Sequence, residues 1–325
     1  MFADARHVNA VAVGDLNGDR KLDAVFATSD EPQVSRVCIG DGSGGFACAP
    51  VNGEVLGSAT SAAVALGDVN GDGKLDAVFG HTAGQPNRVC LGNGAGNFSG
   101  CANLSGDTTP TNGVALGDVN GDGKLDVLLA RSLATKLVCL GNGDGTFAPC
   151  SNVESEMADT YSVALGDVNN DGKLDAVFAN LQGSPPAATF YNRVCLGDGA
   201  GHFSCSAIAA ESDRFASVAL GDVDNDGNLD AVFANNNQLP NRVCLGDGAG
   251  HFACSNVGAY THGSTTVVLA DLNADGHLDA VFGTEPTPTE PAKICLGIGN
   301  GTFTCSDVAA TTTMARGVAA GKLAW

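Results

Sequence analysis

Six short segments of the chain carry closely spaced aspartate and asparagine residues. In the second segment, Asp68, Asn70, Asp72 and Asp76 occupy positions 1, 3, 5 and 9 of a nine-residue loop, with Gly73 at position 6. Three carboxylates this close repel one another unless a cation neutralises them. Side-chain oxygens at positions 1, 3 and 5, a carbonyl at position 7 and a glycine at position 6 are typical of Ca²⁺ loops. The spacing therefore predicts a calcium site, and the all-oxygen ligand set argues against zinc.

Repetition decides between two interpretations of this loop. A single copy is explained as well by a simple turn, because Asp, Asn and Gly are common turn formers. Six copies with an oxygen at all four positions favour metal binding, so one Ca²⁺ per loop is expected. The expected ligands, with position 7 contributing its carbonyl, are Asp15, Asn17, Asp19, Lys21, Asp23, Asp68, Asn70, Asp72, Lys74, Asp76, Asp118, Asn120, Asp122, Lys124, Asp126, Asp167, Asn169, Asp171, Lys173, Asp175, Asp222, Asp224, Asp226, Asn228, Asp230, Asp271, Asn273, Asp275, His277 and Asp279.

Two loops depart from the shared sequence. The fifth loop has Asp224 where the others have asparagine, so it carries four carboxylates. The first loop has Arg20 in place of the glycine. A residue other than glycine costs about 1 kcal/mol there if the backbone needs a positive φ, and the arginine also brings a positive charge close to the ion. The first site is therefore the weakest of the six predicted calcium sites.

The elements around the loops repeat with them. The leading aspartates recur at intervals of 49 to 55 residues, which is the length expected for one propeller blade. In the second repeat, β-type segments cover residues 63–69, 75–79 and 88–91, and a fourth begins at Phe98. Repeating small four-stranded sheets around an axis protects their edges. The sequence therefore predicts an all-β propeller of six four-stranded blades, rather than seven, with the calcium loops between strands 1 and 2.

The predicted propeller is a single domain over residues 1–325. Phenylalanines recur in register in strands 2 and 4, where we expect them to pack blade against blade. A degenerate copy of strand 1 ends the chain, with Lys322 where the calcium aspartate would stand. We expect this spare strand to close the ring or to contact another subunit. The module boundaries are expected near 10–60, 61–112, 113–160, 161–215, 216–264 and 265–315, followed by the extra strand 316–325.

Twelve cysteines form pairs that are 10 or 11 residues apart. Each pair brackets a glycine-rich turn that folds strand 4 back on strand 3, so the two cysteines of a pair lie opposite each other. Thiol metal sites fit less well, because no Cys-x-x-Cys occurs. Six disulfides place the protein in an oxidising compartment: extracellular, cell-surface or periplasmic. The first residues of the sequence lack the apolar stretch of a signal peptide, so we expect none within this chain. The predicted disulfide cysteines are Cys38, Cys48, Cys90, Cys101, Cys139, Cys150, Cys195, Cys205, Cys244, Cys254, Cys295 and Cys305.

The charge balance excludes some classes of partner. Acidic residues outnumber basic ones by 36 to 16, which gives a net charge of −20. Nucleic acids and anionic membranes attract basic surfaces, so neither is expected as a partner. No apolar run is long enough to insert into a bilayer. The six loops contain 19 of the 36 acidic residues, so most of the negative charge comes from the predicted cation ligands.

These motifs resemble the FG-GAP/VCBS-type repeat family, which includes the propeller heads of integrin α subunits. The loop of residues 118–126, DVNGDGKLD, and the turn of residues 140–147, LGNGDGTF, carry the resemblance. It covers about 300 residues and implies a propeller with Ca²⁺ between the first two strands. Members of such a family do not share one function. The disulfide in every module departs from the common family pattern.

The second face of the predicted propeller is the expected place for function. The loops joining strands 2 to 3 and 4 to 1 share this face and differ between repeats, as in 180–192, 235–241 and 284–292. Divergent loops on a rigid scaffold often carry recognition, although unconstrained surface loops diverge as well. His202 and His251 occupy a turn position that other repeats fill with Gly, Asn or Thr, and His81 is interpreted as a lone loop residue. No catalytic group recurs in the repeats, so an enzyme is not expected.

Three non-enzymatic functions remain open. The first is an adhesion or protein-interaction module that binds a protein or glycan through the divergent face. The second is a structural subunit of a surface layer or fibre, self-associating through the C-terminal strand. The third is a carbohydrate-binding lectin, although few aromatic residues lie in the variable segments.

Overall fold

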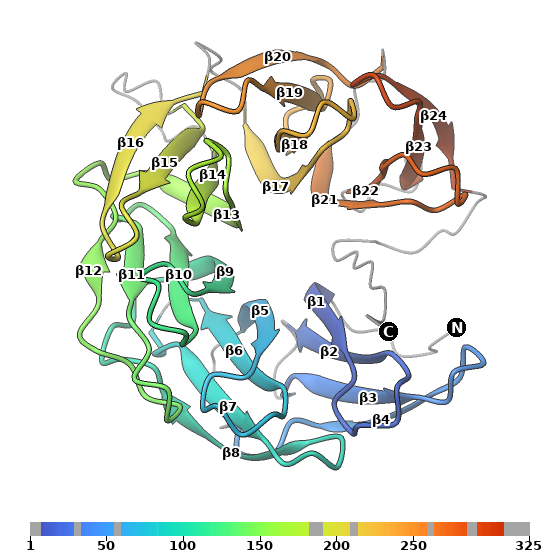
Figure 1. Ribbon diagram of the computed structural model, residues 1–325. Coiled ribbons are helices and arrows are strands. Elements are labelled where there is room, and N and C mark those ends of the chain that lie inside the picture. The colour runs from blue at the N-terminus through green and yellow to red at the C-terminus, as the bar shows by residue number, and fades with distance from the viewer. Residues whose placement is uncertain are drawn as a thin grey trace.

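The computed structural model describes residues 8–28, 34–54, 60–82, 84–181, 191–208, 214–258, 263–284 and 291–308. These residues form six four-stranded antiparallel sheets, each with its strands in chain order. Figure 1 shows the sheets as blades around a common axis. The predicted all-β, six-bladed propeller is confirmed. In this described part of the chain, no helix is long and apolar enough to cross a membrane.

Within the described ranges, the strands follow one another without other regular elements. The first three blades are β1 (Val8–Gly14), β2 (Asp23–Thr28), β3 (Arg36–Gly40), β4 (Phe46–Pro50); β5 (Ser61–Gly67), β6 (Asp76–His81), β7 (Arg88–Gly92), β8 (Phe98–Asn103); and β9 (Thr111–Gly117), β10 (Asp126–Arg131), β11 (Leu137–Cys139), β12 (Ser151–Asn152). The last three are β13 (Asp159–Gly166), β14 (Asp175–Leu181), β15 (Arg193–Gly197), β16 (Phe203–Ala207); β17 (Phe215–Gly221), β18 (Asp230–Asn235), β19 (Arg242–Gly246), β20 (Phe252–Asn256); and β21 (Ser264–Ala270), β22 (Asp279–Thr284), β23 (Lys293–Gly297), β24 (Phe303–Asp307).

The spacing of the cysteines affects the outer strands. Blades with a 10-residue spacing pair strands 3 and 4 without interruption, as β15 and β16 do. The 11-residue spacing in the second blade produces a register shift between Leu91 and Gly92. In the third blade Ala148 still bonds to Leu140 and Ser151 pairs with Val138, so the extra residue falls at Pro149–Cys150. Pro149 has no N–H to give to the sheet. Strand β12 is accordingly only two residues long.

The hydrophobic core lies between blades rather than inside them. One cluster joins Leu16 and Val25 of the first blade to Phe79 and Phe98 of the second, and equivalent clusters span the next four junctions. The strand-2 phenylalanines from Phe79 onward are fully buried there. Blade-to-blade packing by the repeated phenylalanines is thus confirmed.

A glycine at the end of each of the first five inner strands permits this packing. A Cβ on Gly67 would lie 2.7 Å from a methyl group of Leu125, the leucine at loop position 8 of the next blade. In the sixth blade the corresponding residue is Ala270. In the first blade, Phe46 is 41% exposed, whereas Phe98 is 1% exposed. The junction between the sixth and first blades therefore differs from the other five. The predicted strand 316–325 lies outside the described residues.

Candidate calcium loops and the opposite face

The predicted calcium loops connect the first two strands of each blade and turn their oxygens inward. In the second loop, Asp68 Oδ1 accepts the backbone N–H of Asp72 at 3.1 Å, and Oδ2 accepts that of Gly73 at 2.8 Å. Asn70 Oδ1 accepts from Asp72 N at 3.0 Å, and Asp72 Oδ1 accepts from Lys74 N at 3.0 Å. All six loops make the bonds from positions 5 and 6 to the leading aspartate. The side-chain oxygens of positions 1 and 3 therefore meet at the N–H of position 5, and their role as Ca²⁺ ligands remains a prediction.

Two positions of each loop have a left-handed backbone. Position 6 has φ values of 80° to 90° at the five glycines and 64° at Arg20, which confirms that a non-glycine residue is strained there. Position 4 also has a positive φ, with values of 58° at Asn170, 60° at Asn225 and 60° at Ala274. The positive φ at position 4 was not predicted. The sequence indicated it, however, because three loops have glycine at this position.

The ninth-position aspartate ties the loop to the outer strands. Asp76 is completely buried, and its Oδ2 accepts the N–H of Val69 at 2.9 Å while its Oδ1 accepts that of Gly92 at 2.7 Å. Every blade repeats this pair of bonds. The aspartate therefore has a structural role that the sequence argument did not assign. Its predicted role as a Ca²⁺ ligand remains a prediction, since each carboxylate oxygen has a second lone pair.

The fifth loop concentrates negative charge most strongly. Carboxylate oxygens of Asp222, Asp224 and Asp226 lie within 4.8 Å of one another. Burial raises the pKa of Asp230 to about 6, and repulsion from Asp224 and Asp226 adds to this effect against two backbone hydrogen bonds. Burial and the neighbouring Asp226 also raise the pKa of Asp224. This donor set fits a hard divalent cation, which would neutralise the repulsion. Glu154, Cys195 and Cys205 also cluster, but both cysteines belong to a disulfide.

The loops also connect neighbouring blades. The glycine turn between strands 3 and 4 of one blade reaches the calcium loop of the preceding blade, where Gly250 N donates to Val168 O at 3.2 Å. Asn170 Nδ2 donates to Asn228 Oδ1 at 2.8 Å, which joins position 4 of one loop to position 7 of the next. An ion that orders a loop would therefore also stiffen a blade junction.

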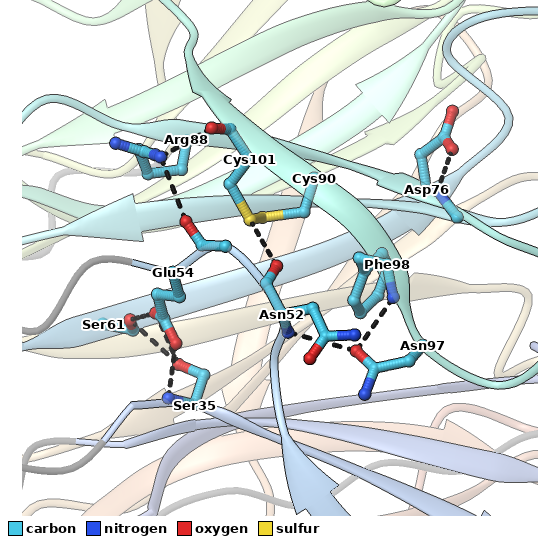
Figure 2. The surroundings of a disulfide bond; sticks show 12 residues. Ser35, Asn52, Glu54, Ser61, Asp76, Arg88, Cys90, Asn97, Phe98 and Cys101 are labelled. Atoms are coloured by element: carbon cyan, nitrogen blue, oxygen red, sulfur yellow. Dashed lines mark hydrogen bonds between the residues drawn. A yellow bond between two sulfur atoms is a disulfide. The ribbon is translucent and has the colours of Figure 1, made fainter.

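All six predicted disulfides are present. Their Cα–Cα separations are 3.8 to 4.2 Å, and no cysteine is free. An arginine on strand 3 covers four of them: in the second blade, Arg88 Nη2 donates to the carbonyl of Cys101 at 2.6 Å (Figure 2). The equivalent bonds are made by Arg36, Arg193 and Arg242. Six disulfides are consistent with an oxidising environment outside the cytosol.

The opposite face carries different contacts in different blades. At the first junction, Glu54 accepts from the hydroxyls of Ser35 at 2.9 Å and Ser61 at 2.8 Å (Figure 2). Its Oε1 lies 3.7 Å from His81 Nε2. Although burial alone would raise the pKa of Glu54, bonds from His81, Ser61 and Ser35 outweigh it and lower that pKa. His81 is therefore not the lone loop residue expected, because it ends β6 and is buried.

The third junction uses a buried ion-pair network instead. Lys136 is fully buried, its Nζ lies 2.8 Å from Glu154 Oε1, and Arg193 of the next blade lies 2.9 Å from Glu154 Oε2. The ammonium also lies 5.5 Å from the ring centroid of Phe178. Sequence reasoning did not identify this network, because Lys136 has no counterpart in the other repeats.

Two large apolar side chains are exposed on this face in the third blade. Leu133 is 64% exposed and Met157 is 59% exposed, and they flank the bridge between Ala134 and Ala158. Leu133 also has a positive φ of 51°. Of the divergent loops predicted to bind a partner, residues 235–241 are described and Leu239 is 38% exposed there. Most of loops 180–192 and 284–292, including Pro185 and Pro186, lies outside the described residues.

Solved structures of several different proteins share this fold. A lectin of Agrocybe aegerita, described as recognising non-reducing terminal N-acetylglucosamine, is 19% identical with a TM-score of 0.64 over 96% of this chain and 82% of its own. The lectin BP39L of Burkholderia pseudomallei is 15% identical with a TM-score of 0.68 over 91% and 82%. The protein U3-55K is 12% identical with a TM-score of 0.58 over 94% and 82%. At these identities the likeness concerns the fold alone.

Sequence comparison places the repeats in a family. No curated protein sequence matches the chain significantly. The model of the FG-GAP-like repeat matches residues 15–79, 68–129, 118–178 and 222–282. These matches cover more than half of the chain and coincide with its calcium-loop modules. The chain therefore belongs to the FG-GAP-like repeat family.

Proposed function

We propose that this chain is a non-catalytic extracellular recognition module, which binds a protein or glycan partner through the face opposite the calcium loops. One observation carries the proposal. The calcium-loop face repeats the same hydrogen bonds in every blade, whereas the networks on the opposite face vary. Glu54 with His81 joins the first junction and Lys136 with Glu154 the third, while an asparagine-to-hydroxyl bond joins the second and the fifth. A rigid scaffold with variable loops on one side is a common arrangement for recognition.

Calcium has a structural part in this proposal. Residues at positions 1, 3, 5 and 9 of each loop would hold the ion, together with the carbonyl at position 7. Bound Ca²⁺ supplies positive charge that offsets the repulsion among the loop carboxylates. The six disulfides constrain the outer strands independently of the ion. The two devices together would keep the opposite face rigid in a dilute extracellular environment.

Two observations bear on the class of partner. The exposed Leu133 and Met157 favour a protein, because the core of a protein interface is more apolar than the rest of the surface and methionine is enriched there. The likeness of the fold to two lectins favours a glycan. The structural-subunit alternative depends on residues 316–325, which lie outside the described part of the chain.

The proposal is tested by display of the Ca²⁺-loaded protein against a glycan array and a library of extracellular proteins. We expect binding that is lost in the double variant Leu133→Asp/Met157→Asp if the partner is a protein. Ala200→Asp, an exposed change in a glycine turn on the calcium face, is the matched control. Binding abolished by the control alone would contradict the proposal. Filaments in electron microscopy, or a ladder of multimers in native mass spectrometry, would favour the structural subunit instead.

A further inference from the structure

A cavity of about 400 Å³ lies on the axis of the propeller. The inner strands of all six blades, β1, β5, β9, β13, β17 and β21, contribute to its lining, together with residues that follow β6 and β18. This volume falls within the range that small-molecule sites usually have, roughly 300 to 1,000 Å³. The cavity is separate from the calcium loops, whose residues do not line it.

A β-bulge near the start of every inner strand places one extra residue at this cavity. In the second blade the pairing passes from Ser61 directly to Ala63, which leaves Ala62 as the extra residue. Bulges re-aim side chains and are common next to functional sites. The six extra residues all line the cavity; they are Asn9, Ala62, Asn112, Tyr161, Ala216 and Thr265.

The residue type at the bulge differs between blades, whereas the rest of the inner strand largely repeats. Two residues after the bulge, four of the six blades have the valines Val11, Val64, Val114 and Val163 in the cavity wall. The six extra residues, which we call the bulge ring, carry two amides, a phenol, a hydroxyl and two alanine methyl groups. Because the inner strands begin at the divergent face, the ring lies toward that end of the axis, where Thr82 and Asn236 also line the cavity.

The lining is uncharged throughout the described residues, although the chain has a net charge of −20. The amides are already oriented: Asn9 Nδ2 donates to Ser61 O and Asn112 Nδ2 donates to Thr160 O, each at 3.0 Å. These bonds tie neighbouring blades together, and they leave the amide oxygens as acceptors.

Two serine hydroxyls also line the cavity. Ser162 Oγ accepts from Val218 N at 3.4 Å and Ser217 Oγ accepts from Val267 N at 3.2 Å, so the hydroxyl hydrogens remain available as donors. Tyr161 adds a half-buried aromatic ring. Neutral donors and acceptors, one ring and apolar walls match a neutral polyhydroxylated ring, which has hydroxyls at its edge and C–H groups on its faces.

We propose that the axial cavity binds a neutral sugar residue, with Tyr161 against a C–H face of the sugar and Asn9 and Asn112 accepting from its hydroxyls. A charged ligand would find no opposite charge in this cavity. An entirely apolar ligand would leave the amides and hydroxyls of the lining without hydrogen-bond partners. This inference rests on the proposed recognition function and names a ligand class and a site for it.

The test uses saturation-transfer NMR on the Ca²⁺-loaded full chain with free neutral monosaccharides: hexoses, N-acetylhexosamines, deoxyhexoses and pentoses. At least one sugar is expected to bind. The variant Ala62→Leu, which fills the cavity from a position without a polar role, should weaken binding at least tenfold. Ala249→Leu, the same change at an exposed turn on the calcium face, should leave the affinity within twofold. Tyr161→Ala should weaken binding about tenfold, as expected for loss of aromatic stacking and its apolar area, and thermal melting of each variant verifies folding.

The outcomes separate this inference from the proposed function. Sugar binding that survives Ala62→Leu would place the sugar site elsewhere and overturn the cavity site alone. If no sugar in the panel binds while the display experiment finds a protein partner, the sugar site is wrong and the recognition function stands. If neither experiment finds a partner, both fail.

Discussion

The two faces of the propeller are built from the same repeats but follow different rules. On the calcium-loop face, all six blades use the same aspartate at position 9 to accept the same two backbone N–H groups. On the opposite face, the first junction uses Glu54 with two serines and a histidine, and the third uses Lys136 with Glu154. The calcium-loop face therefore repeats one set of hydrogen bonds in all six blades. The opposite face uses several networks, of which the asparagine-to-hydroxyl bond recurs at the second and fifth junctions.

The difference shows how stability and variation are distributed. The aspartate and asparagine oxygens of each calcium loop accept backbone N–H groups of the same blade, so the loop sequence must recur with the blade. The networks of the opposite face join different blades, so a change at one junction leaves the others intact. Destabilising changes should accordingly be larger and more uniform on the calcium face.

Removal of calcium should produce the largest effect. When the free Ca²⁺ concentration is 100 times the dissociation constant of a site, binding adds about 2.7 kcal/mol to the free energy of unfolding. Six such sites would act on one cooperative ring. Excess EDTA should therefore lower the melting temperature by more than 10 °C, in proportion to several kcal/mol. Calorimetry measures the shift, and Mg²⁺ added back in place of Ca²⁺ serves as the control. An unchanged melting temperature in EDTA would refute the calcium prediction.

Loss of a ninth-position aspartate should come next. Asp126→Ala leaves the N–H groups of Val119 and Gly141 buried without acceptors, which costs about 2 to 5 kcal/mol. Glu156→Ala on the opposite face removes a partly exposed second partner of Arg193, which keeps Glu154 at 2.9 Å, and should cost about 1 kcal/mol or less. Urea denaturation in EDTA compares the two without any contribution from the ion. Equal losses would show that the faces do not differ as described.

The Glu54 network should make the opposite face sensitive to acid. Because the pKa of Glu54 is lowered in the folded protein from its usual 4.5, its contribution is complete above that value and disappears as the pH falls through the folded pKa. Glu54→Gln should cost about 2 kcal/mol at pH 7, and the difference from the parent should shrink below pH 4.5. Denaturation midpoints of both proteins from pH 7 to 3 provide the measurement. A difference that stays constant with pH would assign the effect to packing.

A backbone change inside the sixth calcium loop should have the smallest effect. Ala274 has a φ of 60° at a position where three other loops have glycine. Ala274→Gly should therefore stabilise the protein by about 1 kcal/mol. Ala249→Gly, in an exposed turn, is the control and should not stabilise. A destabilised Ala274→Gly would mean that the side chain makes a contact that outweighs the strain.

Much of the structure follows from local sequence. The period, the four strands of each blade, the paired cysteines and the strained Arg20 were all predictable, because each depends on residues close together in the chain. Asp76 shows where this reasoning stopped. Its position in the loop indicated a ligand, but its bond to Gly92 depends on how strand 3 returns beside strand 2. His81 and Lys136 were misread or missed for the same reason, since their partners lie in other segments.

The amino-acid sequence by itself determined the family, the number of blades and the six disulfides. Each of these depends on a loop, strand or cysteine pair that lies within one blade and recurs in every repeat. Tertiary structure decided what lies between blades. It buried Lys136 beside Phe178, placed Leu125 against Gly67, and gathered six bulge residues around one axial cavity. These contacts join residues 42 positions apart or more, and only closure of the blades around an axis brings their side chains within reach of one another.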